Sequence, residues 1–422
     1  MSLAAISLAA LLFVLVVSCF SSANVGVLAI VLAWIVGVYA GGMRVDQVLA
    51  GFPVALFLTL VGVTMLFCQA QENGTLDRVA HRAVGLCRGV AGAIPLMFFA
   101  LAAVLSSIGP GNIASTALVA PIGMAAAGRY GIPAFFMAMM IANGASAGSL
   151  SPLAPTGIIV NGIVARLGLP DARAAIYLNN LLVHVVVAVG GYLLLGGWRL
   201  FSSRGRSQSA GETAPQTPPA GGPDMAFEWR HWLTAAVITA LIVGVVFFNL
   251  NVGLGAFAGA LLLTVARAVD DRAAARLVPW NVIILVCGVT VLIALLEKTG
   301  GLELFTDFLA RMAGPRTVTG VAAFFTGLIS IYSSTTGVVL PAFLPMVPGL
   351  VERVGGGDTM AIIYSMNAGG HLVDVSPLST LGALCLAAAA PGTDSRKLFN
   401  QLLAWGLSMS LVGAAVCWLV FR

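Results

Sequence analysis

Two stretches of the chain decide how it folds. Residues 143–157 read NGASAGSLSPLAPTG, and residues 367–382 read NAGGHLVDVSPLSTLG. Asn143 pairs with Asn367 and Ser151-Pro152 pairs with Ser376-Pro377, at nearly the same offset along the chain. Each stretch interrupts an apolar segment with small polar residues, and a membrane helix breaks only where something satisfies the freed backbone groups. The repeated interruption predicts two related halves, each containing a broken helix.

Composition places these stretches in a membrane protein. Of the 422 residues, 59% are hydrophobic and 9% are charged, and the mean hydropathy is +1.01. A soluble domain carries about 25% charged residues. Apolar runs of roughly 20 residues recur along the chain, each long enough to cross a bilayer. They are continuous rather than alternating, which favours helices over a barrel. We therefore predict an all-α polytopic membrane protein with about 10 spanning helices.

The internal repeat extends beyond the two quoted stretches. Gly62 matches Gly288 and Gly74 matches Gly300, again with almost the same offset. We predict a first inverted repeat over 1–200, with a re-entrant hairpin at about 92–128 and a broken helix at about 132–167. The second repeat over 229–422 has its hairpin at about 317–350 and its broken helix at about 358–390. Roughly five crossings per half would invert the second repeat, an arrangement typical of secondary transporters.

The segment between the repeats and the charge distribution predict the orientation. Residues 201–228 are rich in Ser, Gly, Pro and Gln, which indicates a flexible linker. A cytoplasmic linker with both termini outside puts roughly 13 Lys and Arg residues inside against about 8 outside. The net charge of +5 is thus accounted for by loops that orient helices, not by nucleic-acid binding. No basic residue precedes Arg44, so residues 4–21 are interpreted as a first membrane helix.

The breaks are the predicted binding site. Half-helix N-termini present free N–H groups and a positive dipole end to an anion, and C-terminal carbonyls suit a hard cation. The alternative is that Gly and Ser only allow close helix packing. Predicted substrate-binding residues are Asn112, Ser115, Asn143, Thr335, Thr336, Asn367, Ser379 and Thr380. Predicted cation-coupling residues, for Na⁺ or H⁺, are Ser107, Asn112, Ser149, Ser151, Ser334, Asp374 and Ser376.

Three ionisable residues lie within apolar segments, where such residues are costly and often functional. Asp374 either couples a cation or caps the half-helix after Ser376. His371 either has a functional role, binding a carboxylate or shuttling a proton, or a structural one, in packing or capping. His184 stands alone in an apolar helix, where a structural role is favoured. The sequence has no Walker A and no HExxH motif, so we expect no catalysis and no cofactor other than Na⁺ as the candidate coupling ion.

These motifs also carry a family resemblance. The runs Gly109-Pro110-Gly111-Asn112 and 143–148, followed by Ser151-Pro152, resemble the ion-transporter superfamily, which includes the divalent anion/sodium symporters. The first half is most similar to bacterial malonate/dicarboxylate carriers of the MatC type. In the symporters each hairpin tip carries Ser-Asn-Thr. Here the first tip keeps Asn112, and the second keeps Ser334 and Thr335.

The resemblance implies a cation-coupled symporter for small dicarboxylates such as malonate or C4 acids. It further implies a homodimer in the bacterial inner membrane, with a scaffold domain and a transport domain that moves like an elevator. The expected partners are a small anionic substrate, a coupling cation and the lipid bilayer. Two alternatives remain open, a transporter of another organic or inorganic anion and an anion channel.

Overall fold

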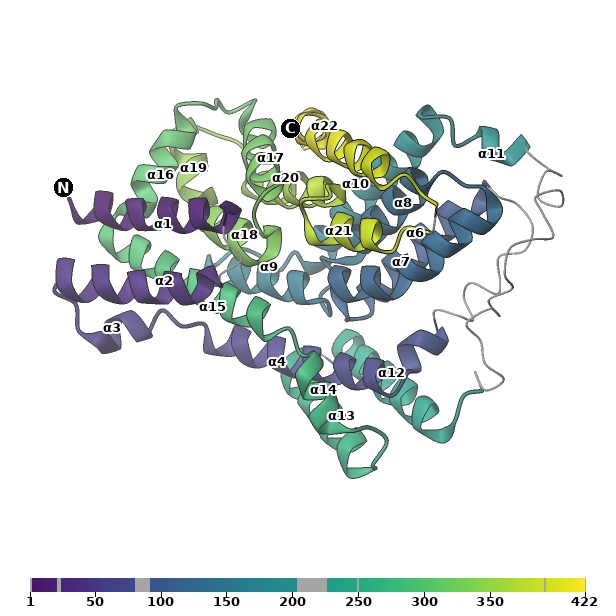
Figure 1. Ribbon diagram of the computed structural model, residues 1–422. Helices are drawn as coiled ribbons and strands as arrows, with labels where there is room; N and C mark the ends of the chain where they lie inside the picture. The colour runs from purple at the N-terminus through teal and green to yellow at the C-terminus, as the bar shows by residue number, and fades with distance from the viewer. Residues whose placement is uncertain are drawn as a thin grey trace.

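The computed structural model describes residues 2–20, 24–79, 92–202, 226–248, 250–390 and 392–421. Within these residues every regular element is a helix, and Figure 1 shows them packed side by side along one elongated body. In the described part of the chain, seven helices are long and apolar enough to cross a membrane, and seven shorter apolar helices accompany them. The predicted all-α polytopic membrane fold is confirmed. The predicted linker over 201–228 lies almost wholly outside the described residues.

The chain runs through the same series of helices twice. The first half contains α1 (Leu3–Phe20), α2 (Val25–Trp34), η1 (Ile35–Ala40), α3 (Val45–Leu49), α4 (Val54–Glu72), α6 (Ala93–Ser107), α7 (Gly111–Tyr130), α8 (Ala134–Gly148), α9 (Pro155–Arg166), α10 (Arg173–Leu194) and α11 (Arg199–Ser202). The second half contains α12 (Trp229–Phe248), α13 (Val252–Val265), α14 (Asp271–Leu277), α15 (Trp280–Thr299), α16 (Gly301–Ala310), α17 (Val318–Ser330), η2 (Thr335–Val339), α18 (Leu340–Phe343), η3 (Leu344–Met346), α19 (Val347–Val354), α20 (Thr359–Leu372), η4 (Val373–Val375), α21 (Thr380–Ala387) and α22 (Ser395–Val420).

Matched glycines lie where a helix of one half packs closely against a helix of the other half. A Cβ atom at Gly62 of α4 would lie 2.5 Å from the carbonyl oxygen of Gly253 on α13. A Cβ atom at Gly288 of α15 would lie 2.1 Å from the carbonyl oxygen of Gly26 on α2. Helices approach this closely only where the residue has no side chain. Helix α4 of the first half and its counterpart α15 in the second half therefore each pack against a helix of the other half.

A second pair of matched glycines gives both halves the same internal packing. A Cβ atom at Gly144 of α8 would lie 2.3 Å from the carbonyl oxygen of Phe99 on α6. At Gly369 of α20 the corresponding distance, to the carbonyl oxygen of Ala323 on α17, is also 2.3 Å. The small residues of the quoted stretches thus set helix packing as well as helix breaks.

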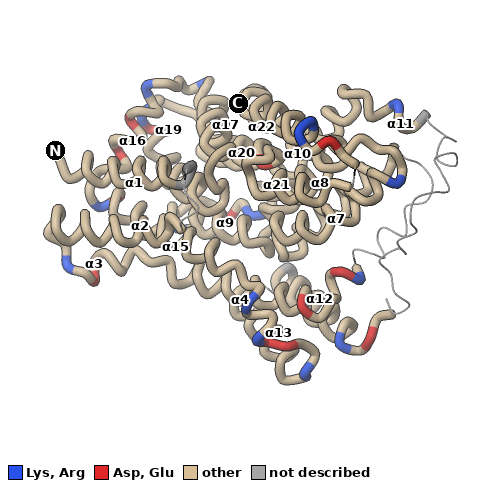
Figure 2. Tube along the Cα trace, viewed as in Figure 1, with Lys and Arg blue, Asp and Glu red and all other residues tan. Residues whose placement is uncertain are grey.

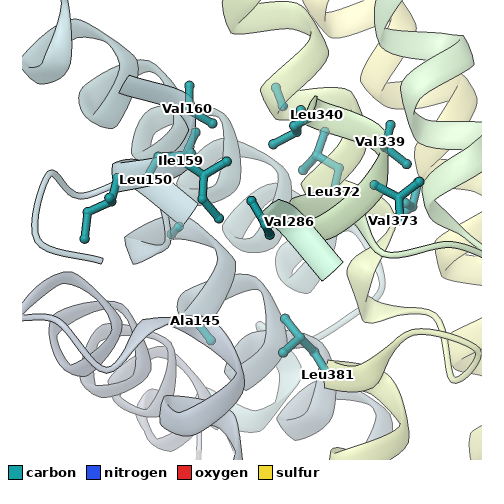
Figure 3. Close-up of a cluster of buried hydrophobic side chains, with 14 of the residues drawn as sticks. Ala145, Leu150, Ile159, Val160, Val286, Val339, Leu340, Leu372, Val373 and Leu381 are labelled. Carbon is teal, nitrogen blue, oxygen red and sulfur yellow. The ribbon is translucent and has the colours of Figure 1, made fainter. Parts of the chain in front are cut away.

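Much of the interior between the halves is apolar, and charged residues lie mainly at the ends of helices. Figure 3 shows Ile159 and Val160 of α9 facing Val286 of α15 and Leu340 of α18, so both halves share one core. Figure 2 shows Lys, Arg, Asp and Glu mainly at helix ends and connecting loops. This division suits helices whose middle sections face hydrocarbon or each other.

Both quoted stretches span the junction between consecutive helices, and the two halves differ there in detail. Helix α8 ends at Gly148 and α9 begins at Pro155, while α20 is followed by η4 before α21 begins at Thr380. The second arm of the first hairpin, α7, has 20 residues and is itself long enough to span. The corresponding arm of the second half begins as a π-helix at Thr335. Re-entrance and the opposite orientation of the halves stay predictions.

Candidate functional site

The four predicted breaks meet at one cavity of about 510 Å³. The two hairpin tips reach it from one half each, and the second segments of the two broken helices, α9 and α21, begin at its wall. Helices α4, α14 and α15 complete the lining. The lining residues are Thr64, Phe67, Cys68, Gln71, Gly109, Pro110, Gly111, Asn112, Ile113, Ala114, Pro155, Thr156, Leu277, Pro279, Val282, Tyr332, Ser333, Ser334, Thr335, Thr336, Asp374, Leu378, Ser379, Thr380 and Leu381.

The first tip is shaped by the Gly-Pro-Gly run. Gly109 has φ of 140° and Gly111 has φ of 79°, backbone conformations that side chains other than glycine rarely adopt. A Cβ atom at Gly109 would lie 1.8 Å from the ring of Phe67 on α4. The tip can therefore turn tightly against α4, and α7 begins there with its N-terminus at the cavity.

The second tip is held by hydroxyl groups. The Ser334 side chain caps η2 by accepting a hydrogen bond of 3.0 Å from the Gly337 amide. The Thr335 hydroxyl donates to a carboxylate oxygen of Asp374 at 2.9 Å, and the Ser379 hydroxyl donates to the backbone carbonyl of Asp374. Asp374 is thereby fixed between the hairpin tip and the start of α21.

Four helix N-termini converge on this space. Gly111 and Asn112 begin α7, Pro155 and Thr156 begin α9, Thr335 begins η2, and Thr380 begins α21. The free N–H groups of each first turn carry a partial positive charge. The hydroxyls of Thr156 and Thr336 lie 3.0 Å apart and connect the two halves across the cavity.

The charge of the lining is unusual for an anion site. Asp374 is the only charged residue among the lining residues, which include no Lys, Arg or His. An anion in this cavity would be held by amides, hydroxyls and helix dipoles. The carboxylate of Asp374, together with the Thr335 hydroxyl, provides oxygen ligands for a cation. The arrangement is suited to binding an anion and a cation at the same time.

Seven of the predicted site residues line the cavity: Asn112, Ser334, Thr335, Thr336, Asp374, Ser379 and Thr380. The structure places the other seven outside the lining. Ser115 on α7, Asn143 on α8 and Asn367 on α20 are fully or almost fully buried. The Asn143 amide donates to the Met139 carbonyl at 2.9 Å, one turn back along its own helix. These three side chains lie among packed helices.

The remaining four predicted residues are engaged in local hydrogen bonds. The Ser107 hydroxyl donates to the Ala103 carbonyl at 2.6 Å and lies 2.9 Å from the Tyr177 hydroxyl. The Ser149 hydroxyl donates to the Ser146 carbonyl at 2.7 Å. The hydroxyls of Ser151 and Ser376 each accept from the amide two residues ahead, at 3.3 Å. Such bonds close the turns that follow α8 and η4.

Sequence reasoning missed the wall that α4 and α15 provide. Thr64, Phe67, Cys68 and Gln71 follow each other at helical spacing on one face of α4. Phe67 and Cys68 are the kind of residue usual on any packed membrane helix, and the polar Thr64 and Gln71 interrupt no helix, so the sequence analysis did not select them. The one hint was the repeated Gly-Val-Thr run at 62–64, whose threonine lines the cavity.

The apolar helices, the repeated architecture and the cavity define a polytopic membrane transporter. Comparison with known proteins agrees with this class. Residues 1–149 match the family model of the dicarboxylate carrier protein MatC N-terminus, which confirms the resemblance for that part of the chain.

Relatives and a solved structure extend the comparison to most of the chain. The uncharacterized transporters MT2759 and Rv2685, from two strains of Mycobacterium tuberculosis, are each 23% identical over an alignment of 382 residues. The alignment covers 87% of this chain and 86% of theirs. The crystal structure of the Alcanivorax borkumensis YdaH transporter is similar with a TM-score of 0.58 and 18% identity, covering 88% of this chain and 87% of that chain. This likeness shows a shared fold.

Proposed function

We propose that this protein is a cation-coupled symporter that carries small dicarboxylates such as malonate or C4 acids. The observation that carries the proposal is the symmetry of the cavity. Each half supplies two helix N-termini, from α7 and α9 in the first and from η2 and α21 in the second. Two anion-binding ends across one cavity match the two carboxylates of a dicarboxylate. The match of residues 1–149 to a dicarboxylate carrier family supports the same substrate class.

The coupling cation is proposed to bind at Asp374. A doubly charged anion entering a cavity without Lys or Arg requires compensating charge, and Asp374 attracts it on the side of the second half. Its equivalent in the first half, at the offset that relates Ser151 to Ser376, is Ser149, so only one end of the cavity has a carboxylate. We further propose that the protein acts as a homodimer in the bacterial inner membrane, by an elevator movement of the helices around the breaks.

The test is uptake of labelled malonate and succinate into proteoliposomes, with Na⁺ and pH gradients imposed separately. Uptake that requires one gradient, and that falls in Thr336→Val and in Ser379→Ala, supports a symporter and names its ion. Flux without a coupling gradient, at rates far above those of carriers, would instead support an anion channel. Absence of uptake of both acids by correctly folded protein would remove the dicarboxylate proposal in favour of another anion.

A further inference from the structure

Asp374 makes one end of the cavity chemically different from the other. It is the only charged residue among the described lining residues, and it is 7% exposed. The Thr335 hydroxyl donates to one of its carboxylate oxygens at 2.9 Å, and no other described residue forms a hydrogen bond or an ion pair with the carboxylate. A carboxylate has two oxygens with about four acceptor positions. Most of the accepting capacity of Asp374 is therefore left for a molecule bound in the cavity.

The backbone carbonyls around Asp374 already accept hydrogen bonds. The carbonyl of Gly370 accepts from the Thr335 hydroxyl at 3.3 Å. The Ser379 hydroxyl donates to the carbonyls of Asp374 and Ser376, to the latter at 2.9 Å. A hard metal ion takes roughly six oxygen ligands, so it would compete with these hydroxyls, whereas a hydrogen-bond donor requires a single free oxygen. The surroundings of Asp374 are therefore better suited to a donor than to a metal ion.

The part of the cavity formed by the first half contains donors and no carboxylate. Asn112 at the start of α7 and Thr156 at the start of α9 line it. The side-chain oxygen of Asn112 accepts from the Ile113 amide at 3.0 Å, and the amide nitrogen of Asn112 has no hydrogen-bond partner among the described residues. The first-turn N–H groups of both helices add partial positive charge. This end is therefore suited to a carboxylate.

A dicarboxylate that spans the cavity places its second carboxyl group beside Asp374. Two ionised carboxylates in contact repel each other strongly away from bulk water, and two carboxyl groups that share a site retain one proton between them. A group that donates a hydrogen bond is accommodated there, because the Asp374 carboxylate accepts. The two ends of the cavity therefore impose different requirements on the two ends of one substrate.

We propose that the cavity selects a small organic anion with a carboxylate at one end and a hydrogen-bond donor at the other, and that Asp374 recognises the donor. This specificity rests on the proposed function and narrows its substrate class. A dicarboxylate meets the requirement as the singly protonated acid, whose carboxyl O–H donates to Asp374. The O–H bond stays intact during transport and dissociates in water after release, so one proton travels with each substrate. That proton takes the place at Asp374 proposed for the coupling cation.

Few other titratable groups surround Asp374. The helices packed against η4 are α8, α17, α20, α21 and α22, and α8 and α17 carry no titratable residue. On the other three helices and in the cavity lining, the titratable residues are Tyr364, His371, Cys385, Arg396, Lys397, Cys417, Cys68 and Tyr332. Of these, Arg396 and Lys397 are exposed at the start of α22. A ligand that does not itself titrate therefore separates protonation of the substrate from protonation of these groups.

Calorimetric binding to the purified full chain in lipid nanodiscs tests the requirement for a donor. The ligands are malonate, its monoamide malonamate and its monomethyl ester, each at about pH 6 and about pH 8. Malonamate has an N–H donor at both pH values, so its Kd should change less than about twofold. The Kd of malonate should rise about tenfold per pH unit above its second pKa. The monomethyl ester, with the same charge as malonamate and no donor, should bind at least about tenfold more weakly than malonamate.

Asp374→Asn tests the residue that recognises the donor. An asparagine amide donates to a carboxylate and still accepts from the Thr335 hydroxyl, so the variant should bind malonate equally well at both pH values. At about pH 8 it should bind malonate at least about tenfold more tightly than the wild type does. Glu352→Gln, which neutralises an exposed carboxylate on α19, is the matched control and should keep the wild-type pH dependence.

The outcomes separate this inference from the proposed function. Equal binding of malonamate and the monomethyl ester, or a malonate Kd that does not depend on pH in the wild type, would overturn the selection of a donor while dicarboxylate transport stands. A wild-type pH dependence in Asp374→Asn would remove Asp374 as the selecting residue. If the folded wild type binds none of the three ligands at either pH, the proposed function fails and this inference fails with it. The wild-type ligand series decides the question even where Asp374→Asn does not fold.

Discussion

Replacing Asp374 by asparagine should separate the charge of this residue from its shape. The Thr335 hydroxyl donates to Asp374 at 2.9 Å, and an asparagine oxygen can accept the same bond. A monovalent cation about 4 Å from a carboxylate gains roughly 4 kcal/mol at an effective dielectric constant of about 20. Because each 1.4 kcal/mol corresponds to about a tenfold change in affinity, Asp374→Asn should weaken the apparent affinity for the coupling cation roughly a thousandfold.

Thr335→Val makes the opposite change, since it keeps the charge and removes the hydrogen bond. A hydrogen bond to a charged group contributes about 1.5–3 kcal/mol, so cation affinity should fall roughly 10- to 150-fold, and Thr335→Ser should restore it. The assay is the cation dependence of malonate uptake in proteoliposomes. Glu352→Gln, which neutralises an exposed carboxylate on α19, is the control. Wild-type cation dependence in Asp374→Asn would show that the carboxylate does not bind the cation.

Three further predictions concern packing, the contact across the cavity, and pH. Gly144→Ala and Gly369→Ala should each lower the free energy of unfolding by about 1–3 kcal/mol, because the new methyl group meets a carbonyl oxygen 2.3 Å away. Thermal unfolding in detergent checks this prediction. Gly190→Ala, which has open space around it, should show no loss of stability. Thr156→Val should reduce malonate affinity by up to about tenfold through loss of the hydroxyl contact with Thr336, and an unchanged KM would refute it. The side-chain hydrogen bond from Arg173 lowers the pKa of the exposed Asp171. The pair therefore stabilises the fold above the ordinary aspartate pKa of about 3.9, and this stabilisation is lost as the pH falls below that value. Asp171→Asn should therefore lower Tm slightly at pH 7, because an exposed pair contributes at most about 1 kcal/mol. A Tm difference from wild type that persists in strong acid would contradict this reasoning.

The positions of the breaks could be predicted from the sequence because membrane helices tolerate so few polar residues. Asn143 and Asn367, Ser151 and Ser376, and the paired glycines stand out against an apolar background, and their nearly constant separation indicates the repeat. The contacts confirm why the glycines recur, since Gly144 and Gly369 meet carbonyl oxygens at the same distance. The hairpin-tip residues Thr335 and Thr336 were selected by the same reasoning, and the structure places both at the cavity.

The direction in which a polar side chain points was beyond this reasoning. Asn143 and Asn367 lie on half-helices near the breaks, yet both side chains are buried and neither lines the cavity. Helical periodicity assigns a residue to one side of its own helix, but the helices packed on that side depend on tertiary structure. The same limit hid Phe67 and Gln71 of α4, which line the cavity from a helix with no polar break.

The close packing of helices from one half against helices of the other half has a consequence for how the protein is made. Helices α2 and α4 bring Gly26 and Gly62 to surfaces that are filled only by α15 and α13, which belong to the second half of the chain. We therefore expect that, while the ribosome is still synthesising the second half, these surfaces of the first half lack their helix partners in the bilayer. The matched glycines become helix contacts only after α13 and α15 have been made, so the first half depends on the second for its final assembly.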